Sequence, residues 1–125
     1  MDRAAEGSET AAVEAPCGRL AGQRLGDILV FKGVPYAKPP LGTLRWLMPE
    51  ALGPWPGVRD ATHFGPICPQ APTQIEALLG GSLGEQSEDC LYLNIWTPGC
   101  DSAARPVMVW IHGGAFVIGA GSQGL

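Results

Sequence analysis

The most apolar stretch of the chain is the run Val-Met-Val-Trp-Ile at residues 107–111, which ends in His112 and two glycines. Five consecutive apolar residues are too few for a helix and are typical of a strand that is covered on both faces. Because Gly113 and Gly114 lack a Cβ, their N–H groups can turn toward a bound oxygen atom and a ligand can approach closely. The pattern therefore predicts a buried strand that leads into a backbone site for a developing oxyanion.

Two shorter apolar stretches, at residues 20–21 and 28–31, lie nearer the N-terminus and are separated by a Gly-Asp pair at residues 26–27. This spacing predicts a small antiparallel hairpin. We expect Lys32 and Gly33 to break the second strand, and Pro35, which has no amide hydrogen, to lie at a sheet edge.

Eight prolines follow between Pro39 and Pro72, with aromatic residues spaced irregularly among them. Neither a helical nor a strand period fits this region, so we expect extended coil anchored by aromatic side chains. Thr73 and Glu76 form a capping box that predicts a short helix. Residues 91–96 then predict a strand, which Pro98 and Gly99 end.

A length of 125 residues limits the chain to one domain at most. Residues 1–17 are rich in Ala, Glu, Ser and Thr, and we expect them to form a disordered tail, with residues 18–125 as a partial domain. The net charge of -4 includes no basic cluster, which argues against nucleic-acid binding, and no apolar run is long enough for a membrane span. No signal peptide is visible, so we expect a cytoplasmic location, with secretion left open if the N-terminus is incomplete.

The four cysteines allow three pairings if all of them are bridged, and the sequence does not choose among them. Their spacing matches no zinc motif, and we expect neither a metal nor a cofactor. Free thiols are expected in the cytoplasm. In an oxidising compartment, a bridge between Cys68 and Cys90 would stabilise the fold by roughly 3 kcal/mol.

Two glycine motifs offer other functions. Gly80, Ser82 and Gly84 form a G-x-S-x-G pattern, and Asp89 or Asp101 and then His112 follow it in the order of a hydrolytic triad. A nucleophile elbow needs a strand before the serine and a helix after it, whereas here a short helix precedes Ser82 and a strand follows. We therefore expect a glycine-rich helix end rather than a nucleophile.

The second motif, G-x-G-x-x-G, is formed by Gly119, Gly121 and Gly124. It would bind a dinucleotide if a helix followed, but it lacks both that helix and the acidic residue some 20 positions on. The alternative is a non-enzymatic binding module. It would either bind a dinucleotide at this motif or complete its fold with another chain.

Two long blocks, residues 88–98 (EDCLYLNIWTP) and residues 106–116 (PVMVWIHGGAF), give the chain a clearer resemblance. Together with residues 33–37 and 39–42, they resemble the type-B carboxylesterases, and most of all their bacterial para-nitrobenzyl esterase branch. The resemblance covers residues 18–125. It implies an α/β-hydrolase fold, of which this chain would hold the small antiparallel N-terminal strands, the long Pro-rich coil and the first strands of the central sheet.

By this resemblance the oxyanion hole maps onto the N–H groups of Gly114 and Ala115, with Gly113 shaping the turn. His112 then belongs to the oxyanion loop and is not the catalytic base. The cysteines that correspond to Cys68 and Cys90 form a disulfide in secreted members of the family.

The resemblance also implies that the chain stops before the nucleophile elbow, so that it holds none of the catalytic triad. We therefore interpret it as the N-terminal fragment of a serine esterase that acts on small-molecule carboxylic esters. We expect the fragment to be inactive alone and to self-associate through exposed strand edges.

Overall fold

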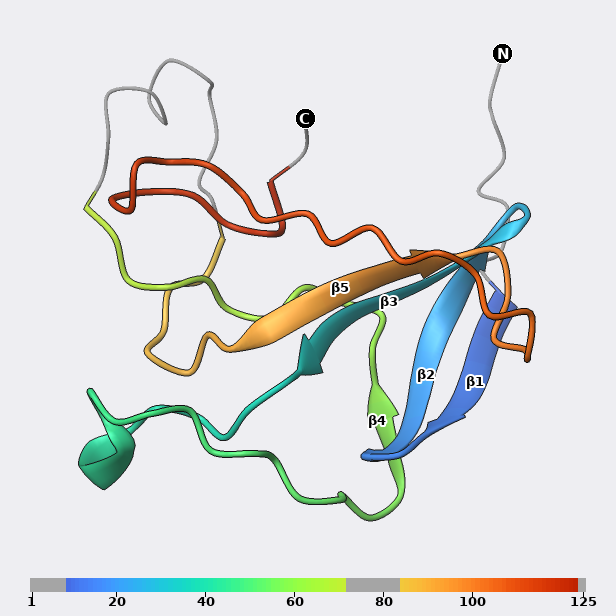
Figure 1. Cartoon of the computed structure of the whole chain (residues 1–125), viewed down its shortest axis with the longest axis horizontal. Coiled ribbons are helices and arrows are strands. Elements are labelled where there is room, and N and C mark those ends of the chain that lie inside the picture. The colour runs from blue at the N-terminus through green and yellow to red at the C-terminus, as the bar shows by residue number, and fades with distance from the viewer. Residues whose placement is uncertain (1–8, 72–83, 124–125) are drawn as a thin grey trace.

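The computed structural model describes residues 9–71 and 84–123, which form a five-stranded sheet (Figure 1). Four strands follow one another in the antiparallel order β1-β2-β3-β5, and the short β4 pairs with β2 in parallel. The elements are β1 (Glu9–Ala15), β2 (Gly18–Leu25), β3 (Ile28–Pro35), the 3₁₀ turn η1 (Gly42–Leu44), β4 (Val58–Asp60) and β5 (Tyr92–Thr97). No helix in this part of the chain has the length and apolarity that crossing a membrane requires.

The expected hairpin is confirmed by β2 and β3. Leu25 pairs with Ile28, so Gly26 and Asp27 form a two-residue turn. Gly26 has a φ of +59°, which glycine adopts without steric cost, and hairpin turns of this length favour such a residue.

The expectation of a disordered tail is wrong for residues 9–15. All seven residues of β1 pair with β2, from Glu9 opposite Arg24 to Ala15 opposite Gly18. The physical reason is a period of two: Ala11, Val13 and Ala15 lie half-buried on one face and pack against the core. Residues 1–8 lie outside the described residues.

The core lies where β2 and β3 diverge. Its buried cluster consists of Leu20, Leu29, Phe31, Val34 and Ala61. The ring of Phe31 covers Gly22, where a Cβ would lie only 2.5 Å from Phe31 Cδ1. Ala61 is inserted between the two strands: its N–H donates to Ala21 O (2.7 Å) and its carbonyl accepts from Lys32 N–H (2.7 Å).

The second strand does not break at Lys32 and Gly33, in contrast to the sequence prediction. Instead β3 continues to Pro35, with a shift in its pairing to β5 between Phe31 and Val34. Gly33 occupies this bulge with a φ of +62°. A bulge absorbs the irregular residue while pairing resumes on either side.

The aromatic residues anchor the coil only in part. Trp55 packs against the core and donates from Nε1 to Arg19 O (3.0 Å), as expected for an anchor. Trp46 instead is 89% exposed, so its expected anchoring role is wrong within the described structure. The capping box at Thr73 and Glu76 lies outside the described residues.

The strand predicted at residues 91–96 is confirmed by β5, but the buried strand predicted at residues 107–111 is wrong. The latter residues form no strand, and their side chains are 69–95% exposed. In Figure 1 this segment doubles back along β5 after the loop at residues 100–105. The described part of the chain offers it no hydrogen-bonded neighbour strand, and apolar residues alone do not make a strand without one.

Candidate oxyanion site

The loop at residues 112–121 is built on a tight turn that begins at Gly114. Its carbonyl accepts from both Val117 N–H (3.0 Å) and Ile118 N–H (3.1 Å). Gly114 has a φ of +119°, and a Cβ there would lie 1.7 Å from Ile118 O. Only glycine fits this position, because a side chain would collide with the backbone that closes the turn.

Two residues without glycine's freedom continue the turn in the left-handed region. Ala115 has a φ of +53° and Phe116 a φ of +61°. Such conformations are uncommon for residues that carry a Cβ and are concentrated at functional sites. The turn thus accommodates the Cβ of Ala115 in a left-handed backbone conformation.

The amides predicted to form the oxyanion hole have no hydrogen-bond acceptor among the described residues. Within residues 9–71 and 84–123, the N–H groups of Gly113, Gly114 and Ala115 donate no hydrogen bond to protein atoms. Gly113 and Ala115 are exposed and Gly114 is half-buried. Successive unpaired amides on a glycine turn can hold an anionic oxygen without any side-chain charge.

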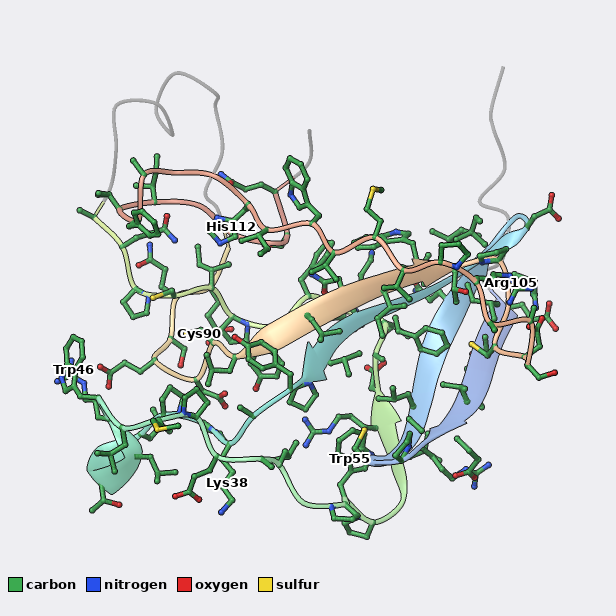
Figure 2. All side chains as sticks on the ribbon, in the orientation of Figure 1. Lys38, Trp46, Trp55, Cys90, Arg105 and His112 are labelled. Carbon is green, nitrogen blue, oxygen red and sulfur yellow. The ribbon has the colours of Figure 1, made fainter. Side chains whose placement is uncertain are left out.

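His112 is engaged within the loop itself. Its Nδ1 lies 2.7 Å from Gly113 O, and a Cβ at Gly119 would lie 2.5 Å from the same nitrogen. Figure 2 shows His112 and Arg105 near opposite ends of β5, and Arg105 is the partner of Asp101 (2.7 Å). Asp101 is therefore remote from His112, and Ser82 lies outside the described residues.

Two side-chain amides that the sequence pattern did not indicate as site residues attach this loop to the rest of the fold. Gln70 Oε1 accepts from Gly119 N–H (2.8 Å), and Gln70 Nε2 donates to Gly119 O (3.1 Å). Asn94 Oδ1 accepts from Gly33 N–H (2.9 Å), and its Nδ2 donates to Gly121 O (3.3 Å). Asn94 could have been noticed as the polar residue within the otherwise apolar run at residues 91–96, whereas no sequence pattern marked Gln70.

The dinucleotide alternative gains no support from this geometry. The N–H of Gly119 is bound by Gln70, and the N–H of Ala120 donates to Gln123 Oε1 (3.2 Å). These are the amides that a pyrophosphate would need.

A cavity of about 230 Å³ lies near the end of this loop, lined by Phe64, Gly65, Pro66, Ile67, Gly84, Glu85 and Ser122.

All four cysteines are free thiols in the structure. Burial, followed by the neighbouring Cys68 thiol and the carboxylates of Asp89 and Glu88, raises the pKa of Cys90 to about 11. The two cysteines singled out as a bridge therefore lie beside each other. Their oxidation stays a prediction.

Solved structures share this fold over most of the chain. A structure of para-nitrobenzyl esterase matches with a TM-score of 0.79 and 48% identity, covering 89% of this chain and 23% of that one. A Geobacillus stearothermophilus carboxylesterase matches with a TM-score of 0.74 and 48% identity, covering 86% of this chain and 20% of that one. The described sheet is thus the N-terminal part of an α/β-hydrolase fold.

The sequence comparisons identify the family. The sequence profile of the carboxylesterase family matches residues 9–124, and the chain therefore belongs to that family. It is 49% identical over 108 residues to para-nitrobenzyl esterase of Bacillus subtilis, covering 86% of this chain and 22% of the relative. It is 46% identical over 107 residues to phenmedipham hydrolase of Pseudarthrobacter oxydans, covering 84% and 22%. The chain thus spans about a fifth of the length of these relatives.

Proposed function

We propose that this chain supplies the oxyanion loop of a carboxylic ester hydrolase that works through a serine acyl-enzyme. The observation that carries the proposal is the left-handed turn that begins at Gly114, where the N–H groups of Gly114 and Ala115 donate no hydrogen bond within the described residues. Membership of the carboxylesterase family supports ester hydrolysis as the reaction. The substrate class is a small-molecule carboxylic ester.

In this proposal the N–H groups of Gly114 and Ala115 donate to the ester carbonyl oxygen as it gains negative charge. Each such donor is worth about 3 kcal/mol when it is aimed at the tetrahedral intermediate. Gly113 shapes the turn, and the resemblance assigns a third donor to the residue after the nucleophile. Backbone donors carry no proton that titrates near neutral pH, so this contribution is independent of pH there.

The 125-residue chain by itself is expected to hydrolyse no ester. Oxyanion donors accelerate a reaction only when a nucleophile and a bound substrate are also in place. Among the described residues, no serine lies within hydrogen-bonding distance of His112. Turnover of para-nitrophenyl acetate by the chain alone, lost on Ser82→Ala, would instead establish the nucleophile at the G-x-S-x-G motif.

The test of the proposal is a segment exchange. The 108 residues of the Bacillus subtilis para-nitrobenzyl esterase that match this chain are replaced by the corresponding residues of this chain. We expect the exchanged enzyme to hydrolyse para-nitrophenyl acetate with saturation kinetics. The unexchanged esterase is the control. An exchanged enzyme that melts cooperatively but shows no turnover would refute the proposal.

We propose also that Cys68 and Cys90 pair under oxidising conditions, since their thiols are neighbours. Mass spectrometry of proteolytic fragments after air oxidation identifies the linked cysteines, and a different pairing would exclude this one.

A further inference from the structure

The side chain of Gln70 binds the main chain of the oxyanion loop at a single residue, Gly119. It accepts from the N–H of Gly119 and donates to the carbonyl of the same residue, so both polar groups of Gly119 are bound by one side chain. Its Nε2 also donates to Cys68 O (3.1 Å). Three contacts leave this amide little freedom to rotate.

The main chain around Gln70 is in turn fixed by contacts with Gln86. Its backbone N–H donates to Gln86 Oε1 (2.9 Å), and the neighbouring Ile67, 6% exposed, forms a parallel bridge with Gln86. The segment that carries Gln70 is therefore a fixed support for the loop.

Asn94 provides the second attachment, from β5 of the sheet. Its Oδ1 accepts from the N–H of Gly33 at the bulge of β3, and its Nδ2 donates to the carbonyl of Gly121. One side chain thus ties the bulge of β3 to the far end of the loop. The bulge matters here because it leaves the Gly33 N–H without a partner in the strand ladder.

These attachments reach the oxyanion amides through a short rigid path. Gly119 follows Ile118, whose N–H closes the turn onto Gly114 O, and the His112 ring lies against Gly119. Fixing Gly119 and Gly121 therefore fixes the turn that aims Gly114 and Ala115.

We propose that Gln70 and Asn94 are positioning residues that preorganise the oxyanion hole, an inference that rests on the proposed function. Donors that are already aimed at the developing charge lower the barrier, because no reorganisation is needed during the reaction. Loss of either attachment leaves substrate binding intact but misaims the donors. The expected signature is a fall in kcat with an unchanged KM.

Isosteric substitutions separate positioning from folding. Asn94→Asp keeps the acceptor for the N–H of Gly33, so the contact with the sheet is retained. It removes the donor to Gly121 O. Gln70→Glu keeps the acceptor for Gly119 N–H and removes the donor to Gly119 O and Cys68 O. Gln23→Glu is the matched control, because Gln23 is also half-buried and its side chain makes no hydrogen bond within the described residues.

In the exchanged enzyme, we expect Gln70→Glu and Asn94→Asp each to lower kcat by about 10-fold or more, with KM within a factor of two. The ratio of Gln70→Glu to parent activity should rise as pH falls toward the pKa of the introduced carboxyl group, since its protonated form can donate again. A residue that only stabilised the fold would show no such pH profile. If the two variants had the same kcat as Gln23→Glu, the positioning role would be overturned. The proposed function would still stand in that case, because it is tested by the activity of the exchanged parent enzyme.

A measurement on the 125-residue chain keeps the inference testable even if the exchanged parent is inactive and the proposed function fails. We expect faster amide hydrogen exchange at Val117 and Ile118, whose N–H groups close the turn onto Gly114 O, by NMR in Gln70→Glu and Asn94→Asp than in the unmodified chain. Unchanged exchange rates at both amides would overturn the positioning role.

Discussion

At the scale of single residues, the site depends on backbone conformations that side chains rarely adopt. The sequence predicted that Gly113 and Gly114 would make a turn with exposed amides, because glycine permits it. It could not predict that Ala115 and Phe116 also adopt a positive φ, since their residue types disfavour it and the surrounding turn imposes it. Nor could it predict that Gln70 reaches across 49 positions to Gly119.

The ion pair of Asp101 and Arg105 makes the stability of the fold depend on pH in the acidic range. Arg105 Nη1 donates to Asp101 Oδ1 (2.7 Å) and Nη2 donates to Oδ2 (2.9 Å), and this hydrogen bonding lowers the pKa of Asp101 from 3.8 to about 2. Because the folded-state pKa is lowered, the pair stabilises the fold above pH 3.8, and this contribution is lost as pH falls toward 2. Carbon NMR titration of the carboxyl group should show the low pKa.

Arg105→Gln should return the pKa of Asp101 most of the way toward 3.8. An Asp101 pKa that is equally low in Arg105→Gln would show that the guanidinium does not cause the shift.

At the scale of elements, the sequence predicted β2, β3 and β5 because each combines apolar residues with a turn or proline at its end. It missed β1, whose small residues give a weak period of two, and β4, whose three residues lie within the proline-rich coil. It predicted a break at Gly33 where the chain forms a bulge, because a glycine signals irregularity without saying whether pairing resumes. The resemblance to a family added what these patterns lacked.

The core between β2 and β3 predicts one large stability effect. Phe31 is 2% exposed and packs on Gly22, so Phe31→Ala should lower the free energy of unfolding by about 3–5 kcal/mol. Phe116→Ala removes the same ring from a fully exposed position and should change stability by less than about 0.5 kcal/mol. Urea unfolding followed by tryptophan fluorescence compares them. Equal effects of the two substitutions would show that the core is misassigned.

At the scale of the whole molecule, the exposed residues 107–111 are the clearest departure from the sequence prediction. They carry the most apolar run of the chain, yet in the described structure they have no strand beside them. Burial of a strand depends on its neighbours, which a local pattern does not contain. Association of chain copies through this run stays a prediction, and sedimentation velocity over a range of concentrations tests it.

The kcat of Gly114→Ala in the exchanged enzyme decides whether the turn at Gly114 acts as an oxyanion hole. A Cβ at Gly114 would collide with Ile118 O, whereas Gly53→Ala places the same methyl group in open space and serves as the control. We predict that Gly114→Ala lowers kcat by about 100-fold or more while Gly53→Ala leaves it unchanged, with both variants folded by thermal melting. A folded Gly114→Ala enzyme with the kcat of its parent would show that the turn at Gly114 is not the oxyanion hole.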